Sequence, residues 1–94
     1  MARQITWTPQ AREEYSTLIS YLLDTFSDSV AEQFTDRLAN VLKSLETMPH
    51  IGRPHPRFTA IRQVIVKPYT VLCYIELADQ LIIVNLLDSR TDPS

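Results

Sequence analysis

The stretch "YTVLCYIELADQLIIVNLL", residues 69–87, decides the fold that this sequence predicts. It contains two runs, "YTVLCYIE" and "LIIVNLL", that are rich in the β-branched and aromatic residues typical of strands. The four residues "LADQ" between the runs suit a tight turn. The stretch therefore predicts a β-hairpin.

A third strand is expected before this hairpin. The run "IRQVIVK", residues 61–67, is also β-rich, and it ends at Pro68, where a bend between adjacent strands is expected. Before it, "TMPHIGRPHPRF", residues 47–58, holds three prolines and the only glycine, Gly52. Because prolines remove backbone donors and disfavour helix, this segment is interpreted as a surface loop.

The N-terminal half predicts one strand and two helices. The alternation in "QITWT", residues 4–8, indicates a strand, and Thr8 followed by Pro9 is a typical helix start. Apolar residues then recur every three or four positions to about Phe26. After the break "SDS", a second helix is predicted, with Ser29 and Glu32 as a capping box. The short break implies a helical hairpin.

The predicted order is β-α-α-β-β-β, an α+β fold in which the helical hairpin packs on one face of an antiparallel sheet. The 94 residues are expected to form one domain, 1–94, because the chain has no room for a second core. A set of apolar side chains should be mostly buried between hairpin and sheet. These are Trp7, Tyr15, Leu18, Leu22, Phe34, Leu38, Val64, Val71, Cys73, Ile83 and Leu87.

Composition excludes several classes of protein. The single cysteine allows no intrachain disulfide, which fits a reducing compartment. No apolar run is long enough to span a bilayer, and the start "MARQITWTPQ" lacks the apolar core of a signal peptide. With one glycine, a glycine-rich phosphate loop is impossible. We therefore expect a cytoplasmic protein with no membrane association.

Charge is unevenly distributed along the chain, although the net charge is only -2. Residues 47–75 contain no carboxylate side chain, whereas they carry several cations. With the arginine that follows the last predicted strand, the candidate binding residues are Arg53, Arg57, Arg62, Lys67 and Arg90. Such asymmetry suggests an anionic partner, but solvated cations explain it equally well. Arg90 could instead pair with Asp88, with Asp92 or with a neighbouring strand.

Catalytic and metal-binding groups are sparse. A metal site would need His50, His55 and Cys73 together, but Cys73 lies within an apolar strand, where a small buried side chain is the simpler interpretation. RNA cleavage would need an acid, a base and cations, and nothing in the sequence orients the two histidines of the proline-rich loop. The sequence therefore predicts no catalytic residue, no metal, no cofactor and no small-molecule substrate.

The whole layout resembles the ParE/RelE superfamily of toxins from type II toxin–antitoxin systems, often labelled plasmid stabilisation proteins. The resemblance rests on the strand, the helical hairpin, a "P-x-x-G-R-P" loop, and "IRQVIVKPYTVLCYIELADQLIIVNLLDSRTDP", residues 61–93. It covers essentially the whole chain and implies a cognate antitoxin as partner.

The RelE-like branch of this superfamily cleaves mRNA on the ribosome. It uses lysines on the second strand, an arginine early in the third, an arginine after the fourth, and a tyrosine near the C-terminus. Aligned through "YTVLCY", the lysine positions fall on Ile61 and Gln63, and the early arginine falls on Thr70. The terminal tyrosine would lie beyond Ser94, so only Arg90 matches.

The resemblance therefore favours the ParE-like branch, whose members inhibit DNA gyrase and have no catalytic site. Two alternatives stay open: a ribosome-dependent endoribonuclease using Arg62, Arg90 and a loop histidine, or an inactive relative that only binds its antitoxin. An acidic, disordered antitoxin tail could fold into a groove along the hairpin, add to an edge strand, and place carboxylates against Arg53, Arg57 and Arg62.

Overall fold

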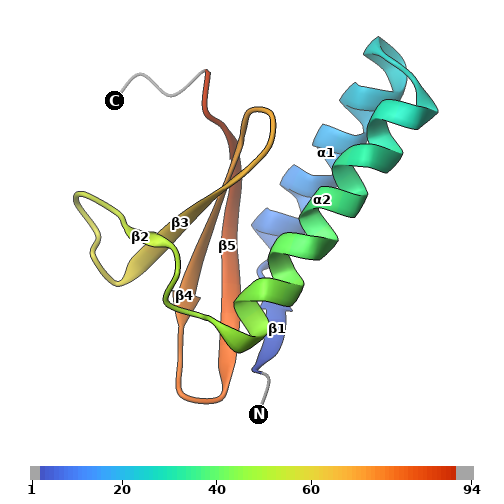
Figure 1. Ribbon diagram of the computed structural model, residues 1–94. Coiled ribbons are helices and arrows are strands. Elements are labelled where there is room, and N and C mark those ends of the chain that lie inside the picture. The colour runs from blue at the N-terminus through green and yellow to red at the C-terminus, as the bar shows by residue number, and fades with distance from the viewer. Residues whose placement is uncertain (1–2, 91–94) are drawn as a thin grey trace.

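The computed structural model describes residues 3–90 and confirms the predicted α+β fold (Figure 1). Both helices lie on one side of a sheet whose strand order is β1-β5-β4-β3-β2. The elements are β1 (Gln4–Trp7), α1 (Pro9–Thr25), α2 (Asp28–Thr47), β2 (Arg53–Pro54), β3 (Ile61–Val66), β4 (Thr70–Glu76) and β5 (Gln80–Asp88).

Two features of the sheet were not predicted. Strand β1 pairs with β5 in parallel, with Gln4 opposite Gln80 and Trp7 opposite Ile83, so the sheet is not wholly antiparallel. The proline-rich loop contains the short strand β2, which is antiparallel to β3. The alternation of a strand predicts its conformation but carries no information about which strand lies beside it, so neither pairing could be deduced from the sequence.

The helix starts are set by hydroxyl caps. As predicted, Thr8 caps α1: its Oγ1 accepts a hydrogen bond from the Ala11 amide at 3.1 Å, and Pro9 occupies the first helical position. Helix α2 begins earlier than expected, because Ser27 and not Ser29 provides the cap, accepting from the Val30 amide at 3.2 Å. In "SDS" either serine could cap a helix, and the extended backbone of Ser27 shows which one does.

The core lies between the helical hairpin and the near face of the sheet. Phe34, Leu38 and Ile83 are buried there as predicted, while Trp7, Tyr15, Leu18, Leu22 and Val64 pack partly buried against it. The other buried members of this core are Ala11, Leu45, Val66, Leu72, Tyr74, Leu81 and Leu86.

Three residues predicted to face the hairpin do not. In the register of the sheet, Val71 lies opposite Ile65 and Leu87, and Cys73 lies opposite Gln63. Side chains alternate along a strand, so these residues point away from the helices while Leu72 and Tyr74 point toward them. Cys73 is buried on that far face, and Leu87 is 40% exposed. The prediction was wrong because β4 carries apolar side chains on both of its faces. The periodicity of the sequence then does not identify which face meets the core.

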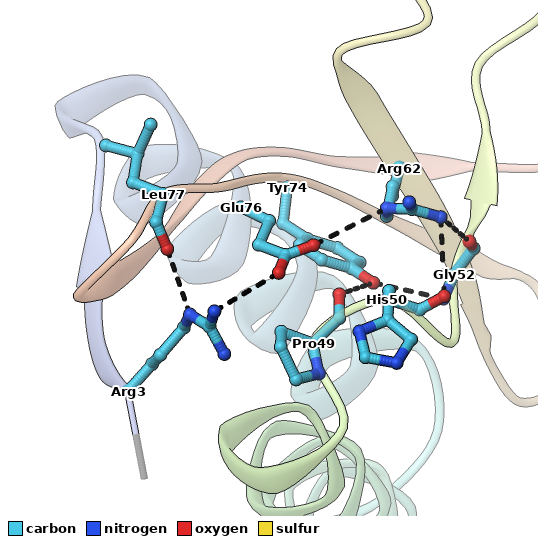
Figure 2. A network of polar contacts seen from close by, with 8 residues as sticks. All are labelled: Arg3, Pro49, His50, Gly52, Arg62, Tyr74, Glu76 and Leu77. Atoms are coloured by element: carbon cyan, nitrogen blue, oxygen red, sulfur yellow. Dashed lines mark hydrogen bonds and ion pairs between the residues drawn. The ribbon is translucent and has the colours of Figure 1, made fainter. Parts of the chain in front are cut away.

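A buried tyrosine ties the proline-rich loop to the sheet (Figure 2). The Tyr74 hydroxyl donates a hydrogen bond to the Pro49 carbonyl at 2.7 Å and accepts one from the Gly52 amide at 3.0 Å. Burial raises the pKa of the Tyr74 phenol above 10.0, against the lowering effect of the Gly52 amide and of Arg62. A Cβ atom on Gly52 would lie 2.7 Å from the Tyr74 hydroxyl and 3.0 Å from the Gln63 carbonyl oxygen, so this close approach requires glycine.

One face of the sheet is buried against the helices and the other is not, so a Val→Ala substitution should lower the free energy of unfolding by different amounts on the two faces. Val66→Ala should lower the free energy of unfolding by about 2 kcal/mol, because Val66 is fully buried in the core and a cavity would remain. Val71→Ala, on the far face of the same sheet, should cost about 1 kcal/mol or less, because solvent can reach the space. Urea denaturation of both variants measures the difference. Equal costs would contradict the assigned facing.

Removing the Tyr74 hydroxyl should destabilise the protein. Tyr74→Phe leaves the Pro49 carbonyl and the Gly52 amide without their buried partner, which should cost about 1–3 kcal/mol at neutral pH. The matched control is Tyr21→Phe, because Tyr21 is 46% exposed and its loss of a hydroxyl should change stability by less than about 0.5 kcal/mol. Thermal or urea unfolding of the two variants beside the wild type measures both effects.

The same tyrosine should contribute to alkaline unfolding. Its pKa is raised in the folded protein above the ordinary value of 10.0, so the unfolded chain ionises first. This contribution to stability is complete below pH 10 and is lost as the pH rises through the folded value. Between neutral and strongly alkaline pH, the free energy of unfolding should therefore fall more steeply for the wild type than for Tyr74→Phe. Parallel curves would contradict the burial of the ionisable hydroxyl.

Candidate functional site

A large groove opens between the tip of the helical hairpin and the end of the sheet. Its volume is about 1040 Å³. Apolar side chains of both helices and of β5 line it, and aromatic residues form much of its rim: Tyr21 is 46% exposed, Phe26 60% and Tyr69 47%. The residues that define the groove include Leu18, Tyr21, Leu22, Phe26, Phe34, Arg37, Tyr69, Leu86, Leu87 and Arg90.

One wall of the groove is the edge of β5. Strand β1 ends at Trp7, opposite Ile83, so within residues 3–90 the part of β5 beyond this point has no strand beside it on that side. Instead, the Glu14 carboxylate on α1 accepts hydrogen bonds from the Leu86 amide at 3.0 Å and from the Asn85 side chain at 3.2 Å. The Glu14 carboxylate thus takes the place of the carbonyl of a neighbouring strand, which would otherwise accept the hydrogen bond of the Leu86 amide.

Arg90 lies at the rim of the groove in an ion pair. Its guanidinium contacts both oxygens of Asp88, at 2.9 Å and 3.2 Å, and lies 4.2 Å above the ring of Tyr69. The hydrogen bond from Arg90 holds the pKa of the Asp88 carboxyl below its usual value. Among the pairings that the sequence left open for Arg90, the one with Asp88 is observed, and Asp92 lies outside the described residues.

Arg62 braces the proline-rich loop (Figure 2). Its Nη1 donates to the Gly52 carbonyl at 2.9 Å and to the His50 carbonyl at 3.3 Å, and its Nε lies 3.8 Å from Glu76 Oε1. The other oxygen of Glu76 lies 3.3 Å from Arg3 Nη2. Because Arg62 lies opposite Tyr74 in the register, its side chain belongs to the hairpin-facing side of the sheet.

The predicted site residues fall into two separate groups. Lys67 and Arg90 lie near the β3–β4 turn, whereas Arg53 and Arg62 lie toward the opposite end of β3. Arg57 follows β2 in the loop. Arg53, Arg57 and Lys67 are exposed, and none of them has an ion pair within residues 3–90.

His55 is held by the backbone of its own loop. Its Nδ1 accepts hydrogen bonds from the Arg57 amide at 3.0 Å and from the Phe58 amide at 3.1 Å, and its ring lies against that of Phe58. The sequence offered nothing to orient this histidine, and the orientation arises from local backbone donors. His55 therefore shapes the loop that carries Arg57.

Within residues 3–90, no helix covers the face of the sheet that points away from α1 and α2, and we call it the open face (Figure 1). Two rows of apolar side chains cross it from β3 to β5 with a more polar row between them that contains Gln63 and Cys73. The aliphatic rows are Ile61, Ile75 and Ile82, and Ile65, Val71 and Leu87. Arg53 lies opposite Gln63 in the register, so it belongs to the same face at the sheet's edge.

The open face provides little for bond-breaking chemistry. Both positions that align with lysines of the RNA-cleaving branch, Ile61 and Gln63, lie on it and supply neither a cation nor a base. Thr70, which aligns with the early arginine, is buried. Within residues 3–90, no group of His, Cys, Asp and Glu side chains is arranged to hold a metal ion.

Sequence reasoning missed the aromatic rim of the groove. Tyr21 and Phe26 pack edge to face with ring centroids 6.1 Å apart, although both are half exposed. The available signal was two large aromatics shortly before the "SDS" break.

Neither helix in the described part of the chain has the length and apolar character needed to cross a membrane.

Several solved structures share the fold of this chain. A chain of the chromosomal ParDE TA system from P. aeruginosa is 12% identical, with a TM-score of 0.77, covering 93% of this chain and 96% of that chain. The YoeB dimer from Staphylococcus aureus is 20% identical, with a TM-score of 0.64 and coverage of 90% and 94%. The DinJ-YafQ toxin-antitoxin complex of E. coli is 14% identical, with a TM-score of 0.64 and full coverage of both chains. At these identities the likeness shows the fold.

Comparison with protein families is more specific. No curated protein sequence matches the chain. The family model described as the ParE toxin of the type II toxin-antitoxin system, parDE, matches residues 5–93, which is nearly the whole sequence. The chain therefore belongs to the ParE toxin family of type II toxin–antitoxin systems.

Proposed function

We propose that this ParE-family toxin acts by binding and inhibiting DNA gyrase, and that its own residues make or break no covalent bond. The aliphatic character of the open face carries this proposal. Where the RNA-cleaving branch would place lysines, the chain has Ile61 and Gln63. An interaction site can be built from aliphatic residues, whereas a nuclease site cannot.

Cleavage of RNA through the neighbouring 2′-hydroxyl would require a base, an acid and cations around one phosphate. Arg90 is the one matching residue, and its guanidinium is paired with Asp88 and stacked on Tyr69. Arg62 is engaged with the Gly52 carbonyl and Glu76, on the hairpin-facing side of the sheet. These arrangements favour structural roles for both arginines over a shared catalytic centre.

The groove is the surface that best fits a cognate antitoxin. It combines apolar walls, an aromatic rim and a stretch of β5 that has no strand beside it within residues 3–90, which suits a segment that folds on contact. The solved DinJ-YafQ structure, one chain of which shares this fold, is a toxin-antitoxin complex. Arg53 and Arg57 are exposed and have no ion pair within residues 3–90, so they can meet carboxylates of a partner. Arg62 instead donates to backbone carbonyls of the loop.

The proposed activity has a direct biochemical test. The purified chain should inhibit DNA supercoiling by bacterial gyrase at roughly stoichiometric concentration, and it should leave translated mRNA intact. Arg90→Ala should weaken inhibition at most several-fold, because it would remove one cation near the end of the sheet and no catalytic group.

Two other outcomes would contradict the proposal. Cleavage of mRNA by the wild type that disappears in Arg90→Ala would identify a ribosome-dependent endoribonuclease. A chain that neither inhibits gyrase nor cleaves mRNA, and whose expression does not slow growth, would be an inactive relative that only binds its antitoxin.

Antitoxin binding in the groove should depend on its aromatic rim. Tyr21→Ala should weaken the affinity for the cognate antitoxin at least tenfold, about 1.4 kcal/mol, because half-exposed tyrosines are frequent anchors in interfaces. Leu23→Ala is the matched control: Leu23 is 45% exposed against 46% for Tyr21, lies on the same helix, and does not line the groove. Isothermal titration calorimetry measures both, and equal affinities would place the antitoxin elsewhere.

A further inference from the structure

Resting on the proposed function, we propose that the open face of the sheet is the surface that docks on the target protein, while the groove on the other side serves the antitoxin. The partner that fits this face is a folded protein presenting an apolar patch bordered by carboxylates. In the proposed function that partner is DNA gyrase.

The first support is the composition of the face. Ile65 is 57% exposed, and the other five members of the two aliphatic rows are also open to solvent in part. Burying such side chains is favourable by roughly 25 cal/mol per Å² of apolar area. Apolar side chains that gather on one exposed face of a small protein commonly mark an interaction site. Leu87, at the end of its row, also borders the groove, so it is the one member shared by the two surfaces.

The second support is rigidity. Five of the six residues in the rows are isoleucine or valine, whose branched side chains have few rotamers. They stand on three hydrogen-bonded strands of the sheet. Because these side chains are already ordered, binding a partner would cost little side-chain entropy on this surface.

The third support is the charge at the border. Arg53 shares the open face with Gln63 at the edge of the sheet, and Arg57 lies in the adjoining loop held by His55. Neither arginine has an ion pair within the described residues. Carboxylates around an apolar patch would complement this border and speed association.

A nucleic acid fits the same face less well. A polynucleotide carries a phosphate at every residue and needs cations along its path. The two rows are aliphatic across all three strands, and the positively charged side chains lie only at the border of the described face. The observations therefore favour a protein over RNA or DNA as the molecule that contacts the rows.

The test places a carboxylate at the most exposed position of the two rows. Ile65→Glu should weaken both binding to purified gyrase and inhibition of supercoiling at least tenfold, while its affinity for the antitoxin stays within about twofold of the wild type. Leu23→Glu is the control, because Leu23 is 45% exposed on α1 and belongs to neither surface, and it should leave both affinities unchanged. Ile65→Thr, which retains a branched side chain, should fold like the wild type and lose gyrase affinity several-fold.

Arg53 provides an independent readout. Arg53→Ala should slow association with gyrase and reduce the dependence of the association rate on salt, and Arg53→Lys should restore much of both.

The outcomes separate this inference from the proposed function. If the wild type inhibits gyrase and Ile65→Glu and Ile65→Thr inhibit it equally well, the open face is not the docking surface, although gyrase remains the target. If both variants lose antitoxin binding instead, the face belongs to the antitoxin and the inference is overturned. If the wild type neither binds nor inhibits gyrase, the proposed function itself fails, and this docking surface fails with it.

Discussion

The proline-rich loop depends on one contact, the Tyr74 hydroxyl buried between the Pro49 carbonyl and the Gly52 amide. Buried backbone groups that lose a partner cost about 1–3 kcal/mol each, so one phenol fixes the path of the chain as it leaves α2. With Gly52 in this position, its carbonyl accepts a hydrogen bond from the Arg62 side chain, and β2 pairs with β3. The placement of Arg53 on the open face results from that alignment.

The groove results from a different constraint, the shortness of β1. The strand pairs with β5 only as far as Trp7, and the chain then turns at Thr8 into α1. The Thr8 amide donates to the Ile83 carbonyl at 3.0 Å, which fixes the turn against β5. Beyond it, the Val84 carbonyl accepts from the Thr8 hydroxyl at 3.4 Å and the Leu86 amide donates to the Glu14 carboxylate. A longer β1 would have covered this edge of β5 and removed one wall of the groove.

Much of the fold could be predicted because its signals are local. The hydroxyl of Thr8 and the ring of Pro9 start a helix wherever that helix packs, and apolar spacing identifies both helices. The facing of β4 could not be predicted, since Leu72 and Cys73 are both apolar and only the register tells which of them meets the hairpin. The roles of Arg62 and His55 were also hidden, because their partners are backbone atoms whose positions exist only in the folded loop.

Two apolar surfaces on opposite sides of one small sheet have a thermodynamic consequence. The groove exposes Tyr21, Phe26 and Tyr69, and the open face exposes Ile65, so these large apolar side chains remain in water when the chain is unbound. A small domain buries a modest fraction of its surface and has little stability to spare. A partner that binds the folded chain at either surface stabilises it in proportion to the logarithm of the partner's concentration over its dissociation constant. We therefore expect the chain to be more stable with a partner bound at either surface than alone.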